Sequence, residues 1–356
     1  MSTYPIIRNR SGTLYRALST DTDTEPIEPL LPLLMPPPPK GSSLFRRWQV
    51  LLIVFVVVVM LYPLSSVFTS RKFNADRWPK INSAGQLTIV MNTFKRNDMM
   101  LDATEHYRSC LLVKHIYIIW SESQPPPERI SAKFQGWKHP TVDFLRQDVD
   151  SLNNRFKPLP GARTDAIFSV DDDMRVDCED LNLAYEVWRG SQRSMVGFMP
   201  RLHLRRNGLL EYRCWLRVWW HGQYSMVLTK AALLHHDFLK LYWSDAHAKV
   251  RDLIDSRRNC EDIAMQFLMS NATALPPIYV KGHLQDLGAL GGISTSQSVV
   301  SAGHMRDRSA CLNDLSGLYH TLPLVLSHQV VDAANNGWTH TPSTFYEYLS
   351  SDLWKW

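Results

Sequence analysis

The chain has 356 residues, 45% of them apolar and 21% charged, which is enough for one large core or two modest ones outside any tails. Its net charge of +5 is spread out, since residues 1–47 hold six Lys/Arg against four Asp/Glu, which leaves 33 against 30 for the rest. A nucleic-acid partner is therefore excluded, because it would need a clustered basic face. None of the five cysteines stands at a spacing typical of zinc ligands, so the sequence favours a disulfide over a structural zinc site.

The N-terminal quarter is predicted to consist of a tail, a membrane anchor and a stem. Residues 26–39 contain seven prolines, so residues 1–45 are expected to form a solvated, cytosolic, proline-rich tail. The run WQVLLIVFVVVVMLYPL at 48–64 has no charge and just spans a bilayer as a helix, which predicts a single-pass signal anchor at 46–68. A buried core helix and a cleaved signal peptide are the alternatives. Residues 69–85 are the expected stem.

The orientation of this anchor rests on features downstream of it. Basic residues flank the apolar run on both sides, so the positive-inside rule does not decide the matter. The sequon that begins at Asn271 and the cysteines available for oxidation both suit a lumenal domain at 86–356. We therefore predict a type II membrane protein that is glycosylated at Asn271.

Residues 86–175 are predicted to form parallel strands joined by crossovers, because segments rich in β-branched residues alternate with a helical one. The strands are expected at Gln86–Asn92, Lys114–Ser121, Thr141–Arg146 and Ala166–Asp171. The helix at Asn97–Cys110 opens with Asn97 and Asp98, residue types that satisfy free amides at a helix start. The predicted fold class is α/β.

Past Asp173 the pattern is less regular, and antiparallel strands followed by helices are expected. The predicted helices are Glu179–Arg189, Asp245–Arg257 and Glu261–Ser270, and the predicted strands are Met195–Pro200, Leu209–Trp220, Tyr224–Thr229 and Ile278–Lys281. The Gly-rich run at 288–294 lacks the spacing and the lysine of a phosphate-binding loop, so it is expected to be a flexible loop. The aromatic cluster is expected to pack in the core, although such rings also stack on sugars; it comprises Trp215, Trp219, Trp220 and Tyr224.

An apolar strand that runs directly into Asp171, Asp172 and Asp173 is the strongest local signal for chemistry. Ligands of α/β sheets bind at strand ends, and carboxylate oxygens there hold Mg²⁺ or Mn²⁺ against a diphosphate. Three adjacent buried carboxylates would be costly without such a cation. The pattern is that of a transferase that uses a nucleotide-sugar, and a solvated acidic turn is the alternative.

A second pair of acids, Glu261 and Asp262, precedes an apolar helical stripe. Acids in a first helical turn also complement the helix dipole, and the sequence leaves both interpretations open. Arg308 is a candidate cation for donor phosphates, with a plain surface arginine as its alternative.

Five segments resemble glycosyltransferase family 64, the exostosin-like family: TFKRND (93–98), SLNNRF (151–156), FSVDDD (168–173), VWWHGQYSMVL (218–228) and RNCEDIAMQF (258–267). The order and spacing hold from Leu87 to the C-terminus. Three further segments look most like the short plant members, which are glycosylinositol phosphorylceramide mannosyltransferases of the Golgi. They are WSES and PPPE between 120 and 128, and PPIYVKG at 276–282.

The resemblance implies a GT-A fold, with a nucleotide-binding half at 86–175 and an acceptor-binding half at 176–356, and a retaining transfer with Mn²⁺. It implies that Asp173 is the metal ligand, that Asp262 is the catalytic carboxylate, and that Cys260 and Cys311 form a disulfide. The implied donor-binding residues are Asn92, Arg96, Ser121, Asp150, Asn154, Arg155, Asp171, Asp172, Glu261 and Arg308.

The plant branch implies GDP-mannose as donor and a membrane glycolipid, a glucuronosyl-inositol phosphorylceramide, as acceptor. Asn92, Ser121 and Asp150 stand where relatives that use UDP-sugars carry Gln, Asn and Asn, which is compatible with GDP. Glu261 replaces an Asp, which keeps the charge and extends its reach. A hexosaminyltransferase that uses UDP-GlcNAc or UDP-GalNAc and a non-catalytic glycan-binding protein of the same fold are the alternatives. The sequence is also compatible with a homodimer.

Overall fold

The computed structural model describes residues 6–8, 14–16, 86–161, 164–290 and 300–332. The chain divides into two compact units, residues 1–72 and residues 73–356. In the first unit, β1 (Ile6–Arg8) and β2 (Leu14–Arg16) pair in antiparallel orientation. No helix in the described ranges combines the length and apolarity needed to cross a bilayer. The predicted anchor at 46–68 and stem at 69–85 lie outside those ranges.

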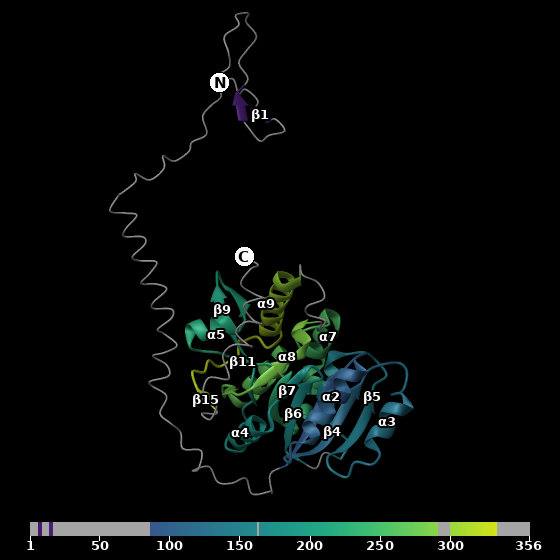
Figure 1. Ribbon diagram of the computed structural model, residues 1–356. Helices are drawn as coiled ribbons and strands as arrows, with labels where there is room; N and C mark the ends of the chain where they lie inside the picture. Colours follow the sequence, from purple (N-terminus) through teal and green to yellow (C-terminus); the bar gives the residue numbers. More distant parts are fainter. Residues whose placement is uncertain (1–5, 9–13, 17–85, 162–163, 291–299, 333–356) are drawn as a thin grey trace, which may run out of the picture. The chain divides into compact units, whose positions relative to one another are not determined.

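The second unit is built on an eight-stranded sheet, in the order β15-β13-β8-β12-β6-β3-β4-β5 (Figure 1). Its strands are β3 (Leu87–Thr93), β4 (Val113–Trp120), β5 (Thr141–Arg146), β6 (Ala166–Asp171), β8 (Val196–Gly197), β12 (Ala231–His235), β13 (Ile278–Lys281) and β15 (Val330–Asp332). Strands β6, β3, β4 and β5 are parallel to one another, whereas β12 is antiparallel to β6 and to β8. The α/β class and the four parallel strands are confirmed, and strands from both predicted halves share one sheet.

Alternation along the strands gives the sheet two buried faces. In β3, Ile89 and Met91 belong to one hydrophobic cluster and Val90 to the other, and in β6 Phe168 and Ile167 divide in the same way. The first cluster includes side chains of α2 (Asn97–Arg108), α3 (Glu128–Phe134) and α4 (Cys178–Arg189). The second includes side chains of α6 (Asp237–Tyr242), α7 (Ala248–Arg257), α8 (Glu261–Thr273) and α9 (Val300–Leu318). Helices therefore cover both faces.

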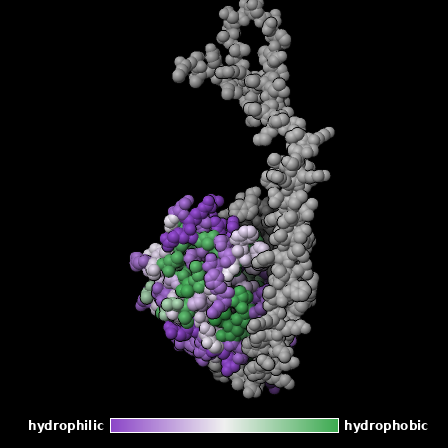
Figure 2. All heavy atoms as spheres, turned by 90° about the vertical axis from the view of Figure 1, so that its left-hand side faces the viewer, coloured by the Kyte–Doolittle hydropathy of each residue, from purple (hydrophilic) through white to green (hydrophobic). Residues whose placement is uncertain are grey.

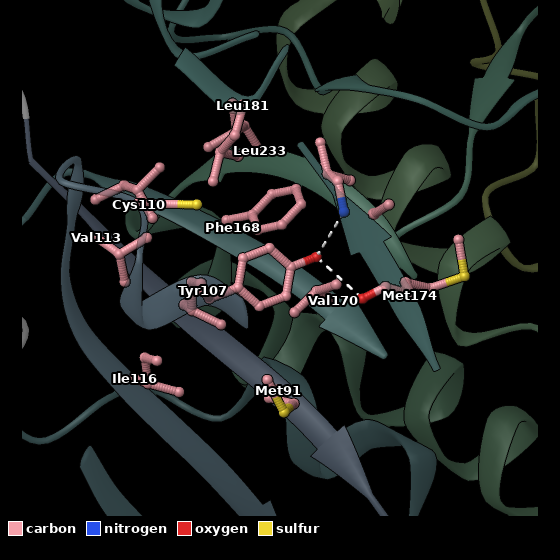
Figure 3. Close-up of a cluster of buried hydrophobic side chains, with 14 of the residues drawn as sticks. Met91, Tyr107, Cys110, Val113, Ile116, Phe168, Val170, Met174, Leu181 and Leu233 are labelled. Carbon is pink, nitrogen blue, oxygen red and sulfur yellow. Dashed lines mark hydrogen bonds between the residues drawn. The ribbon is translucent and has the colours of Figure 1, made fainter. Parts of the chain in front are cut away.

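Tyr107 of α2 anchors the short strand that follows the acidic triplet (Figure 3). Its hydroxyl donates to the Met174 carbonyl at 3.1 Å and accepts from the Val176 amide at 3.3 Å, both in β7 (Met174–Val176). β7 pairs with β14 (Leu284–Asp286). A disulfide between Cys110 and Cys178 joins the segment after α2 to the start of α4. Together these contacts fix the turn in which the triplet lies.

A separate three-stranded sheet is formed by β10 (Leu209–Arg213), β9 (Pro200–Arg206) and β11 (Met226–Val227). Here the predicted strand at Leu209–Trp220 is wrong beyond Arg213, because residues Trp215–His221 form helix α5. Gly222, with φ of 61°, ends this helix in the left-handed region that glycine tolerates. Trp215 and Val218 stand three positions apart, which is helical spacing, and the dense apolar run concealed that period.

The aromatic cluster does not pack as predicted. Tyr224 is buried, but Trp219 is 54% and Trp220 is 72% exposed. In α5 the buried position is Val218, and Trp219 and Trp220 lie on the exposed side of the helix.

Smaller differences concern the ends of elements. The N-cap of α2 is Arg96, and no side chain caps the helix, so the predicted capping by Asn97 and Asp98 is wrong. A 3-10 turn (Asp245–His247) precedes α7, and the residues at 287–290 form another, so the predicted loop at 288–294 begins in a turn and then leaves the described residues. Several elements had no counterpart among those predicted: β1, β2, β7, β9, β12, β14, β15, α3, α6 and α9.

Candidate active site

The acidic triplet lies where β6 ends, between its parallel neighbour β3 and its antiparallel neighbour β12. Asp171 is the last residue of β6, and Asp172 and Asp173 form the turn before β7. The Asp172 amide donates to the Asn92 carbonyl at 3.2 Å, and its Oδ2 accepts from Thr93 Oγ1 at 2.7 Å. Asp172 is completely buried and Asp173 is 9% exposed, so the triplet is part of the interior edge of the sheet and not a solvated turn.

Arg96, at the start of α2, neutralises part of this acidic turn. Its Nη1 lies 2.8 Å from Asp173 Oδ2, and its Nη2 forms an ion pair with Asp172 Oδ1. Burial raises the pKa of Asp172 to about 7, although Arg96 and the Thr93 hydroxyl oppose the shift. Burial and the charge of Asp171 also raise the pKa of Asp173. One guanidinium is therefore insufficient compensation for these two carboxylates.

Arg155 connects the triplet to the acids at the start of α8. It lies in the 3-10 segment Leu152–Phe156, is 3% exposed, and places Nη2 2.6 Å from Asp171 Oδ1 and 3.9 Å from Glu261 Oε1. Burial and the charge of Asp262 raise the pKa of Glu261 to about 7, with Arg155 and Arg308 acting in the opposite direction. The Arg155 guanidinium thus links Asp171 of the triplet to Glu261 of α8.

Asp262 and Arg308 form a buried ion pair with an oxygen–nitrogen distance of 2.9 Å. Arg308 Nη1 also donates to the Tyr212 hydroxyl at 3.0 Å, and its Nε donates to His304 Nε2 at 3.0 Å. Burial alone would raise the pKa of Asp262, but Arg308 and hydrogen bonds outweigh it and hold that pKa below its ordinary value. Asp262 is therefore ionised at neutral pH.

The predicted disulfide holds this ion pair from both sides. Cys260 and Cys311 are bonded, with Cys260 two residues before Asp262 and Cys311 three residues after Arg308. By chain-entropy arguments a link across 51 residues contributes on the order of 4 kcal/mol. It fixes the start of α8 against α9, so the two charged side chains meet with little freedom.

The site carries more negative than positive groups. Five carboxylates face three guanidinium groups in the network: Asp171, Asp172, Asp173, Glu261 and Asp262 against Arg96, Arg155 and Arg308. In addition, Asp173 Oδ1 is buried and accepts no hydrogen bond from any described residue. A hard divalent cation with oxygen ligands fits both observations, and the residues present therefore suit the predicted Mn²⁺.

Of four further residues of the predicted donor site, three lie beside this network and one lies on the surface. Asn154 Nδ2 donates to Ser121 Oγ at 3.1 Å, and both side chains are buried. Asn92 is partly buried at the end of β3, in register with Asp171. Asp150 is exposed and forms an ion pair with Arg258 at 2.6 Å, so it lies apart from the buried network and is tied to the loop before α8.

Known proteins match this chain over the folded unit. The family model described as "Glycosyl transferase family 64 domain" matches residues 87–338. The chain belongs to glycosyltransferase family 64. It is 40% identical over 262 residues to "Glycosylinositol phosphorylceramide mannosyl transferase 1" of Arabidopsis thaliana, covering 70% of this chain and 77% of that protein. It is 28% identical to "Exostosin-like 2" of Mus musculus, covering 71% of this chain and 78% of that protein. The chain is therefore a glycosyltransferase.

Several residues of this family 64 enzyme contact the predicted site but were not found from the sequence. Lys230 Nζ lies 2.5 Å from Asp286 Oδ2, and the pKa of Asp173 responds to both of these charges. A Cβ on Gly288 would lie 2.2 Å from Asp173 Oδ2, so a larger residue there would displace that carboxylate. Tyr212 and His304 position Arg308 from β10 and α9. No local motif marks these five residues, because their roles arise from long-range contacts.

Two other features of the family 64 enzyme lie outside this network. Among the described residues, one His/Asp group brings candidate ligand atoms to within 4.8 Å of one another: Asp165, His235 and His236. It lies at the opposite end of β6 from the triplet, so the predicted metal ligand Asp173 is not part of it. Asn271 of the sequon is exposed in the last turn of α8.

Proposed function

We propose that this enzyme transfers mannose, with retention of configuration, from GDP-mannose to the glucuronosyl-inositol headgroup of an inositol phosphorylceramide. The observation that carries the proposal is the 40% identity to the Arabidopsis mannosyl transferase, over 77% of that protein's length. The charge network supports it, because the excess of carboxylates suits a cation-bound diphosphate.

In this proposal the acidic triplet binds the donor with Mn²⁺, and Asp173 is the protein's metal ligand. When bound, the ion would neutralise charge on the leaving diphosphate. Arg96 and Arg155 are placed for the nucleotide, while Asp171 and Asp172 face the ribose and the sugar. The Arg96 guanidinium already pairs with Asp172 and Asp173, so it is close enough to share its charge with an incoming phosphate.

Asp262 is the proposed catalytic carboxylate, and two routes to retention are open to it. In one, an Asp262 oxygen attacks the anomeric carbon as the bond to the diphosphate breaks, and the acceptor hydroxyl then displaces it, losing its proton to the departed diphosphate. In the other, Asp262 only orients the sugar while the hydroxyl attacks from the face that the diphosphate leaves. Both routes need an ionised Asp262, which its ion pair with Arg308 ensures.

We further propose that the enzyme is a single-pass type II protein of the Golgi membrane, anchored by residues 46–68, with its catalytic domain in the lumen. The two disulfides support an oxidising compartment. The exposure of Asn271 is compatible with glycosylation at that residue. A homodimer is compatible with a single membrane anchor in each chain. A GT-A arrangement is proposed for the catalytic domain, in keeping with the mostly parallel sheet and the acidic triplet at its edge.

Donor hydrolysis by the purified chain tests the proposal. GDP-mannose, UDP-N-acetylglucosamine and UDP-N-acetylgalactosamine are compared with Mn²⁺ present and with Mn²⁺ chelated. We expect metal-dependent turnover of GDP-mannose alone. Turnover that survives chelation would reject the metal assignment, and transfer of the mannose to a soluble glucuronosyl-inositol compound then tests the acceptor.

Hexosamine transfer from a UDP-sugar is the second candidate, favoured by a particular similarity. The chain is 31% identical over 242 residues to "Glucosamine inositolphosphorylceramide transferase 1" of Oryza sativa subsp. indica, covering 67% of this chain and 31% of that protein. Preference for a UDP-sugar in the same donor comparison would assign the enzyme to that reaction.

A further inference from the structure

Helix α5 and the β9–β10 hairpin carry a concentration of exposed apolar side chains. Within twelve residues, Leu209 is 63%, Leu216 37%, Trp219 54% and Trp220 72% exposed. These two tryptophans are the only aromatic residues among the large apolar side chains that are exposed in the described parts of the chain. We name this set of four the outer face.

The period of the helix explains why the three α5 members of the outer face lie together. Val218 is buried and Trp215 is partly buried, and they stand three positions apart on the side that packs on the sheet. Leu216, Trp219 and Trp220 stand at i, i+3 and i+4, which places them together on the other side. A helix that faced only water would carry polar residues at those positions.

The outer face is bordered by positive charge. Residues 201–224 contain five arginines and a single acid, Glu211, which is paired with Arg213. Arg205 and Arg206, near the tip of the hairpin, and Arg217 of α5 are all exposed. Figure 2 views the molecule from the side on which α5 and β9 lie in Figure 1, and apolar residues there stand among strongly hydrophilic ones. Tryptophan and leucine bordered by arginine are typical of a helix at the interface of an anionic bilayer.

The outer face is also connected directly to the catalytic ion pair. Tyr212 accepts a hydrogen bond from Arg308 and stands three residues before Trp215, the first residue of α5. The Cα atoms of Tyr212 and Trp215 are therefore at most about 11 Å apart. Three hydrogen bonds fasten β10 to α9. Asn313 Oδ1 accepts from the Leu210 amide, Asn313 Nδ2 donates to the Leu210 carbonyl, and the Tyr212 amide donates to Ser309 Oγ. A surface bound by α5 would therefore lie at a fixed position close to Arg308 and Asp262.

We propose that the outer face docks on the headgroup region of an anionic lipid bilayer, with Leu216, Trp219 and Trp220 inserted and the flanking arginines on lipid phosphates. Docking holds the catalytic pair over the membrane surface, where a lipid-linked acceptor presents its headgroup. The docking itself stands on the residues of α5, and only the identity of the acceptor rests on the function proposed above.

Fluorescence quenching tests the docking without any substrate. In a background with Cys214→Ser, the full chain is labelled with an environment-sensitive dye at Leu216→Cys or, as a control, at Leu111→Cys, which replaces a residue that is 89% exposed between α2 and β4. The chain is reconstituted in vesicles of phosphatidylcholine and phosphatidylserine whose acyl chains carry bromine. We expect at least about twofold stronger quenching at position 216 than at position 111. Equal quenching at both positions overturns the proposal. Absence of quenching at position 216 also overturns it, and would indicate that another segment or a protein covers α5.

An activity comparison separates docking from chemistry. The double variant Trp219→Ser/Trp220→Ser should lower transfer to an acceptor embedded in vesicles by about tenfold, while donor hydrolysis in solution stays within about twofold of the parent. Leu111→Ser is the matched control and should change neither rate. A parallel loss of donor hydrolysis in the double variant would reject docking in favour of a structural role. If GDP-mannose is not a donor but the quenching persists, the proposed function fails and the docking stands.

Discussion

The triplet region and the region around Asp262 balance buried charge in different ways. At the triplet, Arg96 faces two carboxylates, and burial raises the pKa values of Asp172 and Asp173. At Asp262, one carboxylate meets one guanidinium, and its pKa is lowered. The first arrangement leaves negative charge without a partner, whereas the second is balanced. The same residue types thus build an unbalanced acidic centre, which suits the proposed metal ion, and an ionised carboxylate, by changing only their ratio.

Removing Asp262 should have the largest effect. We expect Asp262→Ala to lower transfer by at least about 10³-fold and, because Arg308 is left buried and unpaired, to lower the free energy of unfolding by about 3–5 kcal/mol. Transfer assays and thermal denaturation measure the two effects.

The double variant Asp262→Ala/Arg308→Met separates those effects, since it should recover much of the lost stability and none of the activity. Metal-dependent donor binding should persist in Asp262→Asn, measured by calorimetry. Full activity of purified, folded Asp262→Ala would contradict the assignment of Asp262 as the catalytic carboxylate.

Removing Asp173 should lower the rate of metal-dependent transfer by about 10²-fold or more, with little cost in stability. In the variant Arg96 keeps Asp172 as an ion-pair partner, and Asp173 Oδ1, a buried oxygen without a hydrogen bond, is removed. The free energy of unfolding should therefore change by less than about 1 kcal/mol. Mn²⁺ titration and chemical denaturation check this. A loss of stability as large as that of Asp262→Ala would contradict the difference between the two regions.

Filling the space at Gly288 should weaken metal binding about 10- to 100-fold, because a Cβ there collides with Asp173 Oδ2 at 2.2 Å. The variant is Gly288→Ala, and the Mn²⁺ concentration for half-maximal donor hydrolysis is the measurement. Gly136→Ala is the matched control, since a Cβ at that glycine meets nothing within 4 Å. Equal metal responses of the two variants would show that Asp173 does not need its present geometry.

Raising the pH from 6 to 8 should lower stability, partly through Glu261. Its pKa of about 7 in the folded state lies above the ordinary value of 4.5, so the folded protein binds the extra proton and loses that stabilisation as pH rises through 7. We expect Glu261→Gln to remove about 1 kcal/mol of this pH dependence in chemical denaturation. Asp172 titrates with the same sign, so some dependence should remain. An unchanged slope would mean that Glu261 does not titrate between pH 6 and 8.

Removing the Tyr212 hydroxyl should have the smallest effect. Tyr212→Phe deletes one of the hydrogen bonds of Arg308 and should lower kcat by about tenfold or less, with KM for the donor nearly unchanged. A steady-state comparison with Tyr224→Phe is the control, because among the described residues that hydroxyl bonds to backbone groups and to Ser327. A loss as large as that of Asp262→Asn would give Tyr212 a direct chemical role.

The sequence predicts the triplet region better than the region of Asp262, for a physical reason. β3 and β6 are short runs of apolar and β-branched residues bounded by polar ones, and Asp171 follows such a run directly, so local pattern alone places it at a strand end. The contact of Tyr212 with Arg308 joins residues 96 positions apart, and no local pattern encodes it. Helix α5 was mistaken for a strand because its dense aromatic run suits either period. The disulfide between Cys260 and Cys311 was implied by family resemblance, whereas that between Cys110 and Cys178 was not predicted.

The exposed pair of Asp150 and Arg258 has a consequence for how such enzymes diversify. A solvent-exposed ion pair contributes little to stability, so either member can be exchanged singly at almost no cost to folding. The buried pair of Asp262 and Arg308 tolerates no single exchange. If Asp150 contacts the donor as proposed, substitutions can accumulate there one at a time, and a lineage can change its nucleotide while the buried pair is inherited intact.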